Sequence, residues 1–491
     1  MKHIWIRIWL PVLLFALASA CSEDFLEKEP LGRVSEDAYF QTPEQAAEAV
    51  NAVYNTLRRW EVHVFAYVGM TDIASDDADK GSTATDASFL LELDNFTLNS
   101  TNLAPLTVWN GYYQGIHRAN VAIERIPAIE MDEQLKNRLV GEAKFLRAYF
   151  YFNLVRWFGG VPLNIKPLTP DEFKQPRATR EQVYAQIIQD LTEAAAALPL
   201  RSGYAPADLG RATKGAAEGM LARVYLTLGD FPKVEQYALS VINSNQYALY
   251  PSYEKLFLRE GENSSESLFE VQATADAQRL GGSQYNEVQG VRGVPNLGWG
   301  FNRPSDDLVR AYEAGDPRRE ATILYVGEIL PDGSAIVEDN PEIVNERYNQ
   351  KAWVPRRADA ANGAGGGNIR ILRYADVLLM AAEALNENNK PQEALNYLNQ
   401  VRKRARGTRT NILPDVTVTD KVQLRERIWR ERRVELALEQ QRWFDIVRQG
   451  RAAALLKAQG KSFQEGKHEL FPIPQNEVDL SGGLVTQNPG Y

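Results

Sequence analysis

Apolar residues recur at three- and four-residue spacing along much of the chain, which is the pattern of amphipathic helices. In the segment 43–60 they form one stripe, and Thr42 precedes it as a candidate N-cap. Comparable stripes predict helices over 107–126, 134–158, 180–198 and 420–448. Four of the nine tryptophans lie on these stripes, and we expect them in the core: Trp109, Trp157, Trp429 and Trp443. The pattern predicts a mainly α-helical protein.

Two of the helical segments have the same order of elements. Residues 215–244 and 373–405 each contain a helix rich in small residues, a short polar turn, and a second helix carrying Ala and Leu. This arrangement resembles the tetratricopeptide helix-turn-helix unit, in which small residues let two helices pack closely. Such units bury their apolar faces only by stacking, so several are expected.

The region 250–368 has a different pattern, with strand-like pieces and many glycines. Two short apolar runs, 267–274 and 321–326, predict strands. Long irregular loops in a globular chain are usually functional or disordered. The aromatic residues Tyr285, Trp299 and Trp353 lie in these loops, so we interpret the region as an irregular lobe that carries a binding function.

Composition and charge narrow the class of protein. The chain has 491 residues, and 55 Lys and Arg against 64 Asp and Glu give a net charge of −9. This balance argues against nucleic acid as a partner. A hydrophobic content of 44% and a charged content of 24% are ordinary for a globular protein. Length alone suggests about three domains, but the repeats favour one helical body with one lobe.

The chain begins with an export signal. Lys2 and Arg7 precede an apolar run over 8–17, which is too short to span a bilayer of about 30 Å. Three small residues follow, and then Cys21, the one cysteine of the chain. The placement resembles a bacterial lipoprotein signal, in which the thiol is lipidated after cleavage. Ala18 stands where leucine is usual, and a plain secretory signal is the alternative.

Six stretches in order resemble the SusD/RagB family of Bacteroidetes outer-membrane nutrient-binding lipoproteins. They span residues 21–30, 141–163, 210–226, 373–387, 430–450 and 470–491. The resemblance implies a SusD-like fold, with four tetratricopeptide-like helix pairs and an irregular lobe with a few short strands. It also implies a lid on a SusC-like TonB-dependent β-barrel transporter that captures a glycan or a peptide. Members of the family are not enzymes, and no cofactor is implied.

With this resemblance the chain divides into four parts. Residues 1–20 are the lipoprotein signal peptide and 21–43 a lipidated tether. Residues 44–249 form an N-terminal helical region, and 250–491 a C-terminal region with the ligand-facing lobe and further tetratricopeptide-like helices. Acidic residues after Cys21 accompany cell-surface export in the family that the chain resembles. We therefore expect a lipid-anchored protein on the cell surface.

The segment 71–81 concentrates carboxylates, among them Asp72, Asp76 and Asp77. Such a cluster can bind Ca²⁺, act as an acid–base pair, or accept hydrogen bonds from sugar hydroxyls. EF-hand spacing fails here because position 6 of the loop would be Asp77 instead of Gly. The scattered histidines show no zinc-binding spacing, so we expect no metal site. A solvated acidic loop and a part of the ligand face remain as alternatives.

Aromatic residues outside the helical stripes are the other candidates for ligand contact, because sugars lay their C–H faces on flat rings. The candidate ligand residues of the lobe are Tyr285, Asn296, Trp299, Asn302, Arg303 and Trp353. Packing within the lobe is the alternative for each ring. In contrast, the charged run 430–435 mixes signs at helical spacing, so ion pairs on a helix face are expected there.

Three functions follow from these observations. The first is a surface lipoprotein that binds a nutrient, an oligosaccharide or polysaccharide, and passes it to a partner transporter; a peptide ligand is the alternative within this class. The second is an exported helical-repeat adaptor without a small ligand. The third is a glycoside hydrolase that uses two aspartates of the 71–81 segment. The resemblance favours the first.

Overall fold

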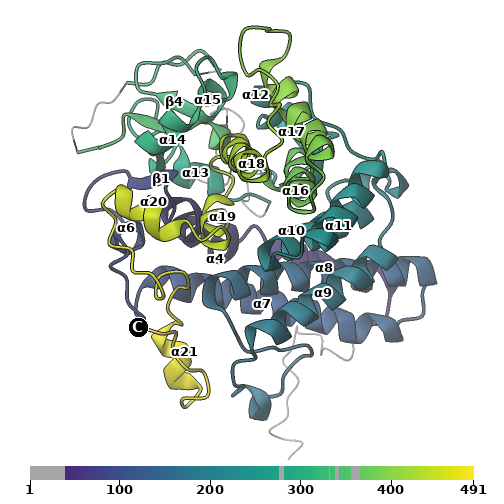
Figure 1. Cartoon of the computed structure of the whole chain (residues 1–491). Helices are drawn as coiled ribbons and strands as arrows, with labels where there is room; N and C mark the ends of the chain where they lie inside the picture. The colour runs from purple at the N-terminus through teal and green to yellow at the C-terminus, as the bar shows by residue number, and fades with distance from the viewer. Residues whose placement is uncertain (1–38, 276–280, 331, 338–341, 355–364) are drawn as a thin grey trace, which may run out of the picture.

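The computed structural model describes residues 39–275, 281–330, 332–337, 342–354 and 365–491 (Figure 1). Helices dominate, and the strands form only two-stranded sheets in this part of the chain. The predicted signal peptide, Cys21 and most of the predicted tether lie outside the described residues. No described helix is both long enough and apolar enough to cross a membrane.

The helical body is a stack of antiparallel helix pairs. Its helices are α3 (Pro43–Thr56), α7 (Leu103–Arg125), α8 (Glu133–Phe158), α9 (Arg180–Ala197), α10 (Lys214–Leu228), α11 (Phe231–Asn243), α16 (Tyr374–Glu387) and α17 (Pro391–Arg406). The packed pairs are α3 with α7, α8 with α9, α10 with α11, and α16 with α17. Helix α11 also packs on α16, so distant segments continue one stack. Two of the pairs, α10–α11 and α16–α17, are the tetratricopeptide-like units predicted over 215–244 and 373–405, and the number of four pairs agrees with what the resemblance implied.

Local sequence signals set several helix starts. Thr42 and Thr179 cap α3 and α9, and each forms a reciprocal capping box with the glutamine three residues later. The prediction for residues 43–60 was too long, because α3 ends at Thr56 and Trp60 starts the separate short helix α4 (Trp60–His63). A bend therefore separates Trp60 from the apolar stripe of α3.

The predicted helix over 420–448 is two helices, α18 (Lys421–Leu436) and α19 (Arg442–Arg448). The chain turns between them through Leu438 and Gln440, which both have positive φ angles, of 60° and 57°. Side-chain contacts hold this corner, since Gln440 donates to Asp72 through its backbone N at 3.1 Å and its Nε2 at 2.8 Å. Periodicity did not reveal the break because residues on both sides are buried.

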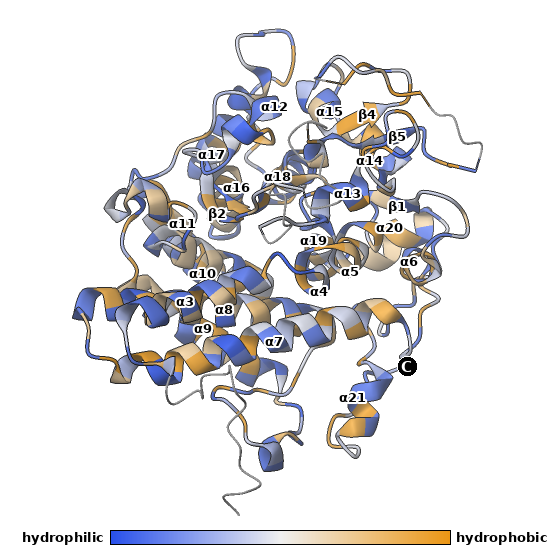
Figure 2. Ribbon diagram, turned by 180° about the vertical axis from the view of Figure 1, so that it is seen from behind, coloured by the Kyte–Doolittle hydropathy of each residue, from blue (hydrophilic) through white to orange (hydrophobic). Residues whose placement is uncertain are grey.

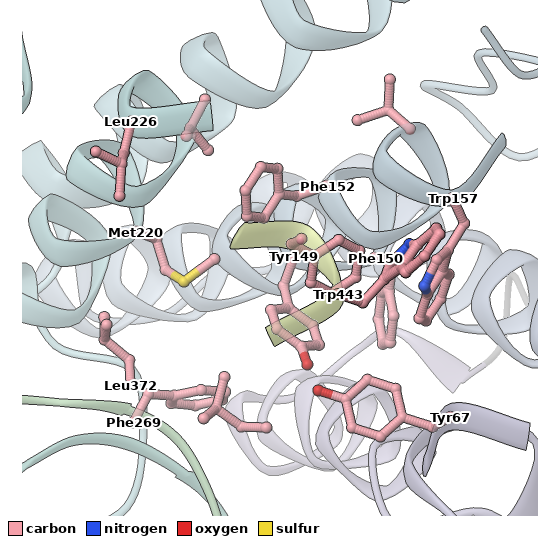
Figure 3. Close-up of a cluster of buried hydrophobic side chains, with 14 of the residues drawn as sticks. Tyr67, Tyr149, Phe150, Phe152, Trp157, Met220, Leu226, Phe269, Leu372 and Trp443 are labelled. Atoms are coloured by element: carbon pink, nitrogen blue, oxygen red, sulfur yellow. The ribbon is translucent and has the colours of Figure 1, made fainter. Parts of the chain in front are cut away.

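A large aromatic core joins the helices of the stack to α19 (Figure 3). Trp157 and Trp443 are fully buried in it, as predicted, and Trp109 is buried too. Trp429 differs from the prediction: it is half-buried, and its Nε1 donates to Glu383 at 2.9 Å. The core is thus built mainly from the dense aromatic face of α8.

The irregular lobe is held by three antiparallel pairs of short strands. β1 (Ala78–Gly81) pairs with β3 (Phe301–Pro304), β2 (Ser267–Val271) with β6 (Ile369–Arg373), and β4 (Ile323–Tyr325) with β5 (Arg347–Asn349). The two strands predicted from the sequence are β2 and β4. The lobe also holds α12 (Tyr253–Leu256), α13 (Tyr285–Gln289), α14 (Asp306–Ala311) and α15 (Pro317–Thr322).

The remaining short elements border the lobe on the other side. They are α5 (Phe65–Val68), a π-helical turn (Gly69–Ile73), α6 (Ser88–Asn95) and α20 (Ala452–Ala458), whereas α21 (Gln475–Leu480) lies apart from the lobe, below α7 in Figure 1. Strand β1 follows the π-helical turn and carries this N-terminal segment into the lobe. The helices α4, α5, α6 and α13 are seen from behind in Figure 2.

A cluster of buried charges lies between the body and the lobe. Its cations are Arg318, Lys351, Arg373, Arg402 and Arg404, and its anions are Glu266, Asp316, Glu431, Glu435 and Glu439. Ion pairs were expected on one face of the 430–435 run. In the structure its carboxylates instead reach partners on other elements, and almost no water contacts them. We call this set the buried charge cluster.

His63, at the end of α4, is a buried histidine held in its neutral form. Its Nδ1 lies 2.7 Å from the carbonyl oxygen of Leu57, and its Nε2 lies 2.5 Å from the Tyr149 hydroxyl. Donation by Nδ1 and acceptance by Nε2 satisfy both atoms without an added proton. Burial lowers the pKa of His63 to about 4.

We therefore expect acid to destabilise the protein through His63. Between pH 6.5 and 4 the unfolded chain binds a proton that the folded histidine does not bind, so stability is present above this window and falls through it. The contribution is up to about 1.4 kcal/mol per pH unit. Urea unfolding at several pH values is expected to show a shallower acid slope for His63→Gln than for the natural chain. An unchanged slope would contradict the assignment, and His117→Gln, at an exposed site, is the matched control.

Candidate functional site

A concave aromatic groove opens between the N-terminal segment and the lobe. Its rings are Phe65, Phe89, Trp299 and Phe301, and its volume is about 740 Å³. Trp60 is outside the lining but contacts two of these rings, Trp299 and Phe65. The rings come from α4, α5, α6, β3 and the loop before β3. The groove thus brings together side chains that lie more than 200 residues apart in sequence. Its volume is typical of a small-ligand site.

The rings contact one another edge to face instead of stacking flat. The centroid of Trp299 lies 5.8 Å from that of Trp60 and 5.9 Å from that of Phe65, and Phe65 lies 4.7 Å from Phe301. Trp60 keeps 36% of its surface exposed, and Trp299 is half-buried. These contacts fix the rings while leaving tryptophan surface open to solvent.

Charged and polar groups lie beside the rings. Asp86 and Arg292 form an ion pair in the lining, and Arg292 also donates to the Ser82 hydroxyl at 2.5 Å. The hydrogen bond from Arg292 lowers the pKa of Asp86, so the carboxylate is charged at neutral pH. Asn296 lines the same groove with an exposed side chain. The site therefore combines flat apolar surface with hydrogen-bond donors and acceptors.

The loop 290–300 is folded back on α13, and this fold presents Trp299. The backbone N of Trp299 donates to the carbonyl of Glu287 at 2.8 Å, and the N of Gly300 donates to the carbonyl of Gly290 at 3.0 Å. Gly298 allows this close approach, because a Cβ there would lie 2.2 Å from the Glu287 carbonyl oxygen. Glycine at 298 thus sets the position of the ring next to it.

Gly298→Ala is therefore expected to weaken ligand binding more than it weakens folding. The added methyl forces the loop away from Glu287 and displaces Trp299, whereas the rest of the core is untouched. We expect about a tenfold loss of affinity with a small change in melting temperature, measured by titration and thermal unfolding. Gly333→Ala is the control for a general backbone effect: it strains a φ angle of 84° in a lobe turn, but no atom lies within 4 Å of the added Cβ, so we expect it to lower stability and leave affinity unchanged. Full affinity in Gly298→Ala would contradict the role given to the loop.

The structure separates the residues that were expected to contact a ligand. Trp299 and Asn296 line the groove. Trp353 is buried in the lobe core with Val291, Leu324 and Tyr348. Asn302 is fully buried and Tyr285 nearly so, and Arg303 pairs with Asp79 at 2.8 Å. Packing of the lobe, the alternative given for each ring, applies to Trp353 and Tyr285.

The acidic segment is buried, so the expectation of a solvated loop is wrong. Asp72, Asp76 and Asp77 each have at most 1% of their surface exposed. Their carboxylates are used inside the protein, because Asp72 accepts from Asn302 and Gln440, Asp76 from Arg442, and Asp77 from Arg433. These contacts fasten the N-terminal segment to the α18–α19 corner. We therefore place the candidate site away from them.

Burial and charge act on these carboxyls in opposite directions. Burial raises the pKa of Asp72 to about 7, against the lowering effect of the hydrogen bonds from Asn302 and Gln440. For Asp76 burial also raises the pKa, but the charges of Arg442 and Arg433 outweigh it and hold the pKa well below its usual range. Asp76 is thus an ionised structural group.

Several residues in or beside the groove were not predicted: Trp60, Phe65, Asp86, Phe89 and Arg292. Trp60 continues the stripe of the preceding helix, so periodicity placed it with core residues. The others lie in short helices and loops without a repeating pattern. Among the described residues no group of three or more His, Cys, Asp or Glu side chains is placed to bind a metal ion.

Comparisons with known proteins identify the family. The sequence model described as "SusD family" matches residues 265–491, and the model described as "Starch-binding associating with outer membrane" matches 24–226. SusD-like protein P2 of Formosa agariphila is 30% identical over 99% of both chains. The chain belongs to the SusD family.

Solved structures agree with this assignment. A laminarin-binding SusD-like protein superposes with a TM-score of 0.79 at 32% identity, covering 92% of this chain and 100% of the other. Surface glycan-binding protein A from Bacteroides thetaiotaomicron, in complex with laminarihexaose, superposes with a TM-score of 0.76 at 26% identity, covering 91% and 99% of the two chains. The SusD-like fold predicted from the sequence is thereby confirmed.

Proposed function

We propose that this protein is a cell-surface lipoprotein that captures an oligosaccharide in the aromatic groove and delivers it to a SusC-like TonB-dependent transporter. The observation that carries the proposal is the pair of partly exposed tryptophans, Trp60 and Trp299, fixed 5.8 Å apart beside the Asp86–Arg292 ion pair. Ring faces bind the apolar C–H faces of sugars, and charged groups hydrogen-bond the hydroxyls. The groove suits a neutral glycan.

The lipid anchor and the transporter partner are proposed on other observations. Cys21 follows an export signal, and acyl chains anchor by burial at about 0.8 kcal/mol per CH₂. Membership of the SusD family supports a partner transporter and the outer membrane as location. The residues that line the groove favour a binding protein over an enzyme. Asp86 is the one carboxylate among the described lining residues, and it is paired with Arg292.

The experiment is a calorimetric titration of the soluble chain, residues 22–491, with a glycan panel. Laminarihexaose leads the panel because two structures similar to this one are described as binding laminarin or its hexasaccharide. Saturable binding without cleavage of the glycan would support the proposal. Binding of peptides but of no glycan would move the ligand to peptides, and hydrolysis of a bound glycan would contradict the non-catalytic role.

A further inference from the structure

A second groove, separate from the aromatic groove, is lined mainly by arginines. It lies over α14, α18, α19 and α20, has a volume of about 550 Å³, and shares no lining residue with the aromatic groove. Its cations are Arg310, Arg427, Arg430, Arg433, Arg442 and Arg451, against the two lining carboxylates Asp307 and Glu426. We call it the arginine groove.

Two of these arginines form no ion pair with a described carboxylate, although the charge of Arg430 helps to lower the pKa of nearby Glu313. Arg433 and Arg442 pair with Asp77 and Asp76, Arg310 with Asp307, and Arg451 with Glu426. Arg430 donates only to the carbonyl of Ala311, and no described carboxylate pairs with it or with Arg427. Both side chains are exposed. An excess of positive charge at this one place on a chain of net charge −9 favours an anionic ligand.

The surplus of positive charge is confined to the arginine groove. Arg427 and Arg430 lie one turn apart on α18 and also line a second hollow of about 260 Å³. The other charged residues of that hollow are Arg402, Glu313, Asp415 and Glu431, so its charges balance. A protein surface would be expected to cover a broader and flatter area. A ligand that carries anionic groups therefore fits the arginine groove itself.

One cation of the groove, Arg451, is also held by a ring; Arg425, on the same ring, lies outside the lining. Trp429 lines the groove, with the guanidinium of Arg425 at 6.0 Å and that of Arg451 at 5.6 Å from its ring. The Nε1 of Trp429 is fixed by Glu383. Cation–π contacts of this kind reduce the motion of arginine side chains. A planar guanidinium held this way binds carboxylate or sulfate oxygens with two parallel hydrogen bonds.

We propose that the arginine groove is a second glycan site, which binds oligosaccharides that carry sulfate or carboxylate groups. The site is independent of the aromatic groove. Sulfate esters and uronate carboxylates share the chemistry that arginine recognises, so both sources are tested. The protein would then hold an anionic glycan, or an anionic branch of a glycan, in the arginine groove, and neutral sugar in the aromatic groove.

The test is titration of residues 22–491 with three probes of equal length: dextran sulfate oligosaccharide, oligogalacturonate and neutral dextran oligosaccharide. We expect at least one anionic probe to bind, to bind more weakly at high salt, and to exceed the neutral probe at least tenfold in affinity. Arg427→Gln with Arg430→Gln is expected to lower that affinity at least tenfold. Arg427→Gln alone, which leaves the Arg430 contact to Ala311 in place, is expected to lower it severalfold.

The control variant Arg180→Gln with Arg319→Gln removes the same charge from two exposed sites on α9 and α15. It is expected to keep full affinity, and thermal unfolding checks that all variants are folded. An equal loss in the control variant, equal binding of the neutral probe, or undiminished binding in the Arg427 and Arg430 variants would overturn the proposal. The proposal would also be overturned if neither anionic probe bound. In that case an acidic protein would be the partner to test for this surface. Laminarihexaose titration reports separately on the aromatic groove.

Discussion

Replacing Trp299 by alanine is expected to weaken glycan binding by about thirtyfold or more. Trp299 lies at the centre of the aromatic groove, in contact with both Trp60 and Phe65. Loss of a central aromatic contact commonly costs about 2 kcal/mol or more of binding free energy, which is about thirtyfold in affinity. We expect Trp60→Ala to show a similar loss, although that ring is at the edge. Calorimetric titration with laminarihexaose measures both.

Two further variants separate ring stacking from general damage. Trp299→Phe keeps an aromatic face and is expected to recover much of the affinity. Phe173→Ala removes a ring that is 65% exposed and outside the groove, so it is expected to bind as the natural chain does. If Trp299→Ala bound as tightly as the natural chain, the aromatic groove would not be the glycan site.

Arg373→Met is expected to destabilise the protein by about 3–5 kcal/mol, because it leaves buried carboxylates without a cation. The guanidinium of Arg373 is 2% exposed and lies 2.8 Å from Glu266, 2.6 Å from Glu435 and 2.7 Å from Glu439. Burial alone would raise the pKa of Glu435, but Arg404, Arg373 and Arg318 hold it well below its usual range. Urea unfolding at neutral pH measures the loss.

The double variant Arg373→Met with Glu439→Gln tests the cause. It removes one buried negative charge together with the positive charge, so we expect it to be more stable than Arg373→Met alone. Arg319→Met, at an exposed site on α15, is expected to change stability by less than about 0.5 kcal/mol. Equal destabilisation of the single and double variants would mean that lost packing, not unpaired charge, accounts for the effect.

Helix positions followed from the sequence because their causes are local. Periodic apolar residues, the caps Thr42 and Thr179, and the matching segments 215–244 and 373–405 predicted the stack. The sequence did not indicate that the charges of 430–435 are buried, because helical spacing shows only neighbours on the same helix. Their partners, such as Arg318 and Arg373, come from elements 60 to 120 residues earlier.

The candidate site was predicted in part. Trp299 was predicted because it lies outside the helical stripes, and Asn296 because it flanks Trp299; both line the groove. Trp353 met the same criterion but packs inside the lobe, since a loop position does not determine which way a side chain faces. The aspartates of 71–81 have the composition of a surface loop, but in the interior Asp76 and Asp77 pair with distant arginines and Asp72 accepts from the amides of Asn302 and Gln440.

Strand pairing also bears on the order in which the protein gains its binding activity. β1 pairs residue Ala78 with Pro304, and β2 pairs Ser267 with Arg373, so these two sheets close loops of 100 residues or more. Pairs this distant form slowly, whereas the helix pairs of the stack are local and form quickly. The helix pairs of the stack are therefore expected to form before the lobe closes. The N-terminal half of the groove therefore exists first as an exposed aromatic surface, and a newly made chain becomes able to bind only when the lobe folds onto it.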